Sequence, residues 1–154
     1  MSLLQIGKKA PLWTLPRGPQ AVLSLKNLYG TPIVLVFYPA DWSPVCSDQL
    51  SLYNELEKEF QKYQAKLVAI SVDGIWCHQA FLTQRKLFFP LLSDFEPKGK
   101  VAREYGVYLE KEGFSGRALF VLDADGVIGW HYLAPTGINP GAEGIFQALQ
   151  ALPR

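Results

Sequence analysis

A cysteine stands where a buried strand is expected to give way to a helix. The surrounding stretch is FYPADWSPVC, residues 37–46, which brings Pro39, Ser43 and Cys46 into one short segment. A free thiol has a pKa of about 8.5, so it is mostly protonated at neutral pH, and only the thiolate attacks. The first turn of a helix offers free N–H groups and the positive end of the helix dipole, and both favour an anion. This position therefore suits a nucleophilic thiolate at Cys46.

The residue types beside Cys46 favour the same interpretation. The hydroxyl of Ser43 could face the sulfur across the first turn, and Trp42 supplies an apolar wall. Pro39 and Pro44 fix the backbone and remove two N–H donors. Taken alone, a free cysteine is more often a buried structural residue, and Ser43 could simply cap the helix. The combination of strand, Pro, Ser, Cys and helix start favours catalysis.

The elements that must position these residues alternate between strand and helix. In chain order we expect a short strand or hairpin within 10–28, a buried strand over 32–38, a helix over 46–64, a second buried strand over 66–72, a helix over 76–87, an extended piece over 89–94, a short helix over 97–106, a hairpin of 117–123 and 127–133, and a helix over 141–152. This order predicts an α/β fold in a single domain over 1–154: a central mixed, mostly parallel sheet with helices on both faces.

Two features of this pattern concern the site. The apolar residues of the first two helices fall near helical spacing, at Leu50, Tyr53, Leu56, Phe60 and Tyr63 and then at Trp76, Phe81 and Leu82. Ligands of such sheets bind beyond the carboxyl ends of the strands. Cys46 and Cys77 each follow a predicted buried strand, so both are expected at that edge.

Composition excludes several classes of function. The formal net charge of +1 argues against nucleic-acid binding, and no run of 18 apolar residues predicts a membrane span. The N-terminus lacks the pattern of a signal peptide, and two cysteines are too few for a secreted disulfide scaffold, so we expect a cytoplasmic protein. His78 and His131 show no zinc spacing with the cysteines and are expected to be structural or solvated. No metal site is therefore predicted. No glycine-rich phosphate loop follows a strand, so no nucleotide cofactor is predicted either.

The chain resembles the peroxiredoxin family, also known as the alkyl hydroperoxide reductase and thiol-specific antioxidant superfamily. PADWSPVC matches its P-x-x-x-T/S-x-x-C signature at Pro39, Ser43 and Cys46. Further segments of the chain resemble the family: GKKAPLWTLP, VLVFYP, ISVD and RALFVLDADGVI. In the last of these, Arg117 matches the position of the family's active-site arginine. The resemblance runs from about Gly7 to Leu152. FPLLSDFEPKGKVAREYGVY is most similar to the alkyl hydroperoxide reductase E-like and bacterioferritin-comigratory-protein branches.

The resemblance implies a thioredoxin-like fold and a thiol peroxidase. Cys46 would reduce hydrogen peroxide or an organic hydroperoxide and become a sulfenic acid. Ser43 would hydrogen-bond thiolate and peroxide, Arg117 would stabilise the negative charge, and Pro39 would shield the site from water. Where the family often has Glu, this chain has Gln49, which carries no charge. Arg117 could also be an ordinary surface arginine. Thioredoxin or another thiol would be the reductant, and exposed aromatic residues could support a homodimer.

The resolving step is expected at Cys77. The strands before Cys46 and Cys77 are expected to be parallel neighbours, and family members do carry resolving cysteines in the helix after the second strand. Because each cysteine begins a helix, a disulfide would require one first turn to unwind. Alternatively, Cys77 is a buried filler beside Trp76 and an external thiol resolves Cys46. Two other functions stay open: a thioredoxin-like thiol–disulfide oxidoreductase, although WSPVC lacks the first cysteine of its motif, and a non-enzymatic interaction module.

Overall fold

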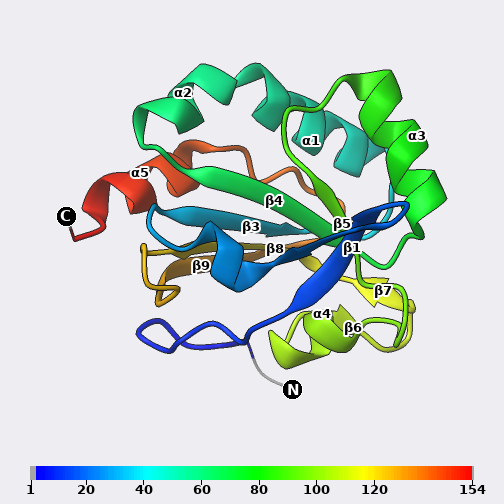
Figure 1. Ribbon diagram of the computed structural model, residues 1–154, viewed down its shortest axis with the longest axis horizontal. Coiled ribbons are helices and arrows are strands. Elements are labelled where there is room, and N and C mark those ends of the chain that lie inside the picture. The colour runs from blue at the N-terminus through cyan, green and yellow to red at the C-terminus, as the bar shows by residue number, and fades with distance from the viewer. Residues whose placement is uncertain (1–2, 154) are drawn as a thin grey trace.

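A five-stranded sheet runs through the computed structural model, which describes residues 3–153 (Figure 1). Residues 1, 2 and 154 of the predicted domain lie outside the described residues. The elements in chain order are β1 (Thr14–Gly18), β2 (Ala21–Ser24), the 3-10 helix η1 (Leu25–Leu28), β3 (Ile33–Phe37), α1 (Pro44–Glu55), α2 (Glu57–Lys62), β4 (Lys66–Ser71), α3 (Ile75–Arg85), β5 (Leu91–Ser93), α4 (Lys100–Glu104), β6 (Tyr108–Leu109), β7 (Phe114–Ser115), β8 (Arg117–Leu122), β9 (Ile128–Ala134) and α5 (Glu143–Ala151).

The sheet is mixed, as the sequence predicts. Its strand order is β5-β4-β3-β8-β9. β3 pairs with β4 and β4 with β5 in parallel, whereas β8 is antiparallel to both β3 and β9. The predicted neighbours β3 and β4 therefore lie side by side, and the loops that follow them meet at one edge of the sheet.

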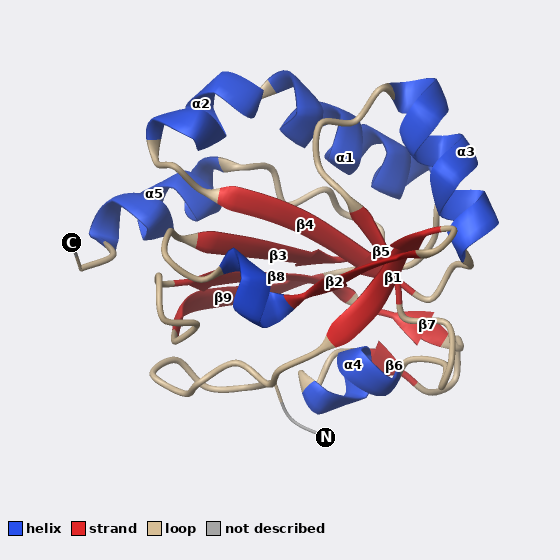
Figure 2. Cartoon of the chain, in the orientation of Figure 1, coloured by secondary structure: helices blue, strands red, loops and turns tan. Residues whose placement is uncertain are grey.

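Strand β3 is buried on both faces, which explains its continuous apolar sequence. Its side chains alternate between two cores. Ile33, Leu35 and Phe37 belong to the core that includes α4, and Val34 and Val36 to the core that includes α1 and α5. Figure 2 shows the same division: α1, α2 and α5 cover one face of the sheet, and α4 with the N-terminal segment covers the other. The prediction of helices on both faces is confirmed.

The predicted helix 46–64 is wrong in one respect, because it is two helices. The α-helical hydrogen-bond pattern lapses at Leu56, whose N–H bonds to the Tyr53 carbonyl three residues earlier. The second piece, α2, places the ring of Phe60 against those of Tyr53 and Phe146, with centroids 6.2 and 4.9 Å apart. The break is accompanied by aromatic packing between residues far apart in sequence, and the local sequence pattern does not predict that packing.

The predicted apolar stripe of helix α3 is also only partly correct. Phe81 is fully buried, but Trp76 is 70% exposed, so it lies off the buried face. The buried residue of the first turns is instead His78. The alternative in which Cys77 is a buried filler beside Trp76 is not supported, because Cys77 is only partly buried and Trp76 is exposed.

The hairpin of β8 and β9 turns where Asp-Gly predicts it. Gly126 has a φ of 83°, which favours glycine. A Cβ at this position would also lie 2.6 Å from the ring of Tyr29. The turn fixes β8 antiparallel to β9, and the start of β8 thereby reaches the edge of the sheet that carries Cys46.

Candidate active site

Cys46 lies in the first turn of α1, where the sequence places it. Pro44 is the first residue of the helix, and the first N–H that closes an α-helical bond is that of Ser47, which donates to the Ser43 carbonyl over 2.8 Å. The N–H groups of the residues between have no helical acceptor, as at any helix start. Cys46 is 0% exposed and belongs to the same core cluster as Val36. The thiol thus lies at the positive end of a helix in an apolar, water-excluding environment.

Ser43 holds the N-cap position without making the usual capping bond. Its backbone is extended, and its hydroxyl donates to the Ala40 carbonyl over 3.1 Å instead of binding a helix N–H. The oxygen keeps its acceptor capacity. Pro39, four residues earlier, is buried between β3 and this turn. Pro39, Ser43 and Cys46 therefore lie within one short connection from β3 to α1.

Arg117 is buried, so the alternative of an ordinary surface arginine is wrong. It begins β8, is 2% exposed and donates from Nη1 to the Gln49 side-chain oxygen over 2.7 Å. Its Nε and Nη2 donate to the Thr136 carbonyl over 3.0 and 2.7 Å. Among residues 3–153 no carboxylate lies within salt-bridge distance of this guanidinium. Since Gln49 lies one turn after Cys46, Arg117 is tied to the helix that carries the thiol.

The amide of Gln49 continues this chain of hydrogen bonds into the core. Its nitrogen donates to the Tyr53 hydroxyl over 3.1 Å, and that hydroxyl donates to the Gly141 carbonyl over 2.8 Å. Burial raises the pKa of Tyr53 to about 12, although the Gln49 hydrogen bond and the Arg117 charge act in the opposite direction. Tyr53 is therefore a neutral anchor that fixes Gln49, and Gln49 in turn fixes Arg117.

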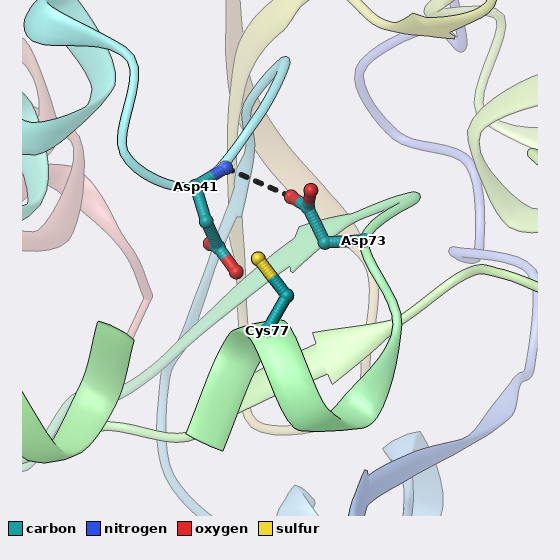
Figure 3. A group of neighbouring side chains, drawn as sticks. All are labelled: Asp41, Asp73 and Cys77. Atoms are coloured by element: carbon teal, nitrogen blue, oxygen red, sulfur yellow. Dashed lines mark hydrogen bonds between the residues drawn. The ribbon is translucent and has the colours of Figure 1, made fainter. Parts of the chain in front are cut away.

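Cys77 lies half-buried in the first turn of α3. Its neighbours are the carboxylates of Asp41 and Asp73 (Figure 3), whereas the helix of Cys46 binds a guanidinium. The Cys77 Sγ and carboxylate oxygens of Asp41 and Asp73 lie within 4.8 Å of one another. Burial raises the pKa of the Cys77 thiol to about 11, and the negative charges of Asp41 and Asp73 add to the effect. Both cysteines are free thiols. Because Asp41 belongs to the loop that leads to Cys46, Cys77 touches that loop while the buried Cys46 lies in the apolar core.

The Asp41, Asp73 and Cys77 group offers three ligand atoms for a cation, but three of its four carboxylate oxygens already make hydrogen bonds within the protein. Asp41 accepts from Tyr38 and contacts His78. Oδ2 of Asp73 accepts from the Asp41 N–H and from the Ser71 hydroxyl. These bonds join the loop before Cys46 to the end of β4 and to helix α3.

Sequence reasoning missed Asp41 and gave His78 no role beyond structure. Both are buried, and His78 Nδ1 lies 2.7 Å from Asp41 Oδ2. The expectation that His78 is structural agrees with this burial. The available signal was positional: Asp41 and Asp73 follow two neighbouring parallel strands.

Comparisons with known proteins identify the family. The model of the AhpC/TSA family matches residues 6–131. The peroxiredoxin of Thermoplasma volcanium is 32% identical over 157 residues, which cover 96% of this chain and 74% of that protein. Alkyl hydroperoxide reductase E of Mycobacterium tuberculosis is 35% identical over 127 residues, which cover 82% of this chain and 83% of that protein. The chain belongs to the AhpC/TSA family of peroxiredoxins.

Solved structures agree with this assignment. Peroxidoxin BcpB of Mycobacterium tuberculosis superposes with a TM-score of 0.87 at 28% identity, covering 98% of this chain and 99% of that one. AhpC of Enterococcus faecalis superposes with a TM-score of 0.86 at 28% identity, covering 98% of this chain and 92% of that one. The predicted thioredoxin-like fold is confirmed, and the chain is a thiol peroxidase of the peroxiredoxin type. Every helix within residues 3–153 is too short or too polar to cross a bilayer.

Proposed function

We propose that Cys46 is the nucleophile that reduces hydrogen peroxide and organic hydroperoxides. The Cys46 thiolate attacks the terminal oxygen of ROOH, the O–O bond breaks, and the sulfur becomes a sulfenic acid while RO⁻ takes a proton and leaves as water or an alcohol. The observation that carries this proposal is the buried thiol in the first turn of α1, on the same helix face as the residue that Arg117 binds.

The neighbouring residues take distinct roles in this step. The helix start and the Arg117 guanidinium stabilise the thiolate and the charge that moves onto the oxygens. Arg117 is suited to this role because it is buried and no carboxylate among residues 3–153 neutralises it. Ser43 hydrogen-bonds the incoming peroxide, and Pro39 keeps water away. Gln49 orients Arg117 without cancelling its charge.

We propose Cys77 as the resolving residue. Its thiol attacks the sulfenic sulfur of Cys46, a disulfide forms, and the hydroxyl leaves as water with the proton that Cys77 gives up. Contact between Cys77 and the Asp41 loop supports this assignment. The raised pKa of Cys77, about 11, works against the attack while the thiol stays beside its carboxylates. Resolution therefore requires the first turn of α1 or of α3 to open. An external thiol, such as that of thioredoxin, then reduces the disulfide.

The experiment is one equivalent of hydrogen peroxide followed by intact-mass and peptide mass spectrometry. We expect a monomeric product lighter by two hydrogens, with a peptide that links Cys46 to Cys77. Cys77→Ser should stop at the sulfenic acid and over-oxidise readily. A parent product with oxidised Cys46 and a free Cys77 thiol would instead show that an external thiol resolves Cys46. An unreactive Cys46 would exclude the peroxidatic role itself.

A homodimer through strand β9 completes the proposal. β9 is one edge of the sheet; its first residue, Ile128, pairs with Gly7 and Lys8, whereas Tyr132 and Leu133 farther along are 44% and 48% exposed. An exposed apolar edge strand of this kind favours pairing with a second copy. Sedimentation velocity of the parent and of a Leu133→Lys variant should give a dimer and a monomer, and a monomeric parent would exclude it.

A further inference from the structure

The loop from β3 to α1 is held by one buried carboxylate, that of Asp41. The Asp41 side chain is 0% exposed, and both of its oxygens are engaged. Oδ1 accepts from the Tyr38 hydroxyl over 2.6 Å, and Oδ2 lies 2.7 Å from His78 Nδ1. The Asp41 backbone N–H donates to Asp73 Oδ2 over 2.8 Å. Asp41 thereby joins the end of β3, helix α3 and the end of β4.

The partner His78 is itself oriented from its other side. Its Nε2 lies 3.1 Å from the Leu92 carbonyl, which can only accept, so Nε2 carries a hydrogen. On the other side of the ring, His78 Nδ1 lies at hydrogen-bond distance from Asp41 Oδ2. This arrangement is rigid because the ring is 3% exposed and is fixed at both nitrogens. His78 thus transmits the position of α3 and β5 to Asp41.

The next residue, Trp42, shows that the loop is held against its own preference. Its φ of 71° is left-handed, which is uncommon for a residue with a large side chain. Its ring packs edge-on against Phe81 of α3, with centroids 5.0 Å apart. Such conformations persist where the surroundings over-determine them, and they cluster at functional sites. Asp41 and Trp42 therefore pin the loop to α3 immediately before Ser43.

We propose that Asp41 is a positioning residue for the peroxidase reaction: through Tyr38, His78 and Asp73 it holds the Pro39–Ser43 loop closed beside Cys46. This inference rests on the proposed role of Cys46 as the nucleophile. The closed loop keeps Ser43 and Pro39 in place for the small peroxide and excludes larger reagents from the fully buried thiol. Loss of Asp41 should therefore slow peroxide attack and, at the same time, make Cys46 more accessible to a bulky alkylating agent.

The test is Asp41→Asn, with Asp94→Asn as a matched control. Asp94 is also buried, but it accepts from the N–H groups of Val101 and Ala102 at the start of α4, away from the loop. Peptide mapping by mass spectrometry gives two rates at Cys46 in each protein: oxidation by hydrogen peroxide and alkylation by a bulky maleimide. Tyr38→Phe is a milder second variant that removes one hydrogen bond to Asp41 and keeps the ring.

The two rates should move in opposite directions. In Asp41→Asn we expect oxidation to slow by about tenfold to a hundredfold, because misplaced groups lose rate steeply. Alkylation should rise by about threefold or more as the loop opens locally. Tyr38→Phe should show the same signs with smaller changes. Asp94→Asn should lose thermal stability and keep the parent ratio of the two rates, because a merely structural carboxylate does not change that ratio.

The outcomes separate this inference from the proposed function. If Cys46 of the parent is not oxidised, the proposed function is wrong and the role of Asp41 falls with it. If the parent reacts and Asp41→Asn keeps the parent ratio, the role of Asp41 alone is excluded. If Asp41→Asn does not fold, an unchanged ratio in Tyr38→Phe excludes it in the same way.

Discussion

The two cysteines occupy corresponding places and have opposite environments. Each lies in the first turn of a helix that follows a parallel strand, and β3 and β4, the two strands, are neighbours. Cys46 is fully buried, and the Arg117 guanidinium donates a hydrogen bond to Gln49 on the same helix. Cys77 is half-buried beside two carboxylates. The two thiols therefore share a helix start but differ in their burial and in the charged groups nearest to them.

The strongest test of this contrast exchanges each thiol for a hydroxyl. Cys46→Ser should abolish peroxide consumption and keep the fold, whereas Cys77→Ser should keep the first oxidation of Cys46. Peroxide loss in the presence of a dithiol reductant measures both. A Cys46→Ser protein that consumes peroxide at the parent rate would reverse the assignment of roles.

The second test removes the cation from the Cys46 side. Arg117→Ala should slow peroxide attack by about 10²–10³, the usual effect of losing one donor to a developing charge. Arg103→Ala is the control, since that guanidinium pairs with Glu110 at the surface. Equal peroxide rates in the parent and in Arg117→Ala would show that Arg117 takes no part in the chemistry.

A third test removes one anion from the Cys77 side. Asp73→Asn should lower the pKa of Cys77 from about 11, because a negative neighbour that disfavours the thiolate is gone. Alkylation of Cys77 at a fixed pH below that value should rise by about threefold to tenfold, since each unit of pKa is a factor of ten in thiolate. The control is the alkylation rate of Cys77 in Asp94→Asn, because that carboxylate binds the start of α4 and not the surroundings of Cys77. An unchanged alkylation rate of Cys77 would show that the charge of Asp73 does not act on this thiol.

The smallest effect concerns stability at high pH. The folded protein raises the pKa of Cys77 from 9.0 to about 11, so the fold prefers the neutral thiol. This contribution to stability is fully present below pH 9.0 and is lost as the pH rises toward 11. Urea midpoints should therefore fall slightly more steeply over this interval in the parent than in Cys77→Ser. Parallel curves would indicate that solvent screening cancels the effect.

Much of this arrangement could be predicted from local patterns. Continuous apolar runs give β3 and β4, Asp-Gly gives the β8–β9 turn, and Pro44 with Ser43 gives the start of α1. Arg117 came from resemblance, because nothing local distinguishes it from a surface arginine. The break at Leu56, the exposure of Trp76 and the contact of Asp41 with His78 depend on residues far apart in sequence. Tertiary packing determines such features, and the spacing of residues along the sequence does not predict that packing.

The anchoring of α1 sets a mechanical limit on how far its start can open. Gln49 and Tyr53 are fixed to Arg117 and to the Gly141 carbonyl, so unwinding from the N-terminal end should stop at Gln49. The freed segment would be residues 44–48. A helical segment of this length spans about 7.5 Å and an extended one about 17 Å, because the rise changes from about 1.5 to about 3.4 Å per residue. Cys46 is three residues from Gln49, so it lies about 4.5 Å along the helix from that residue when the turn is intact and can reach at most about 10 Å from it when the turn opens.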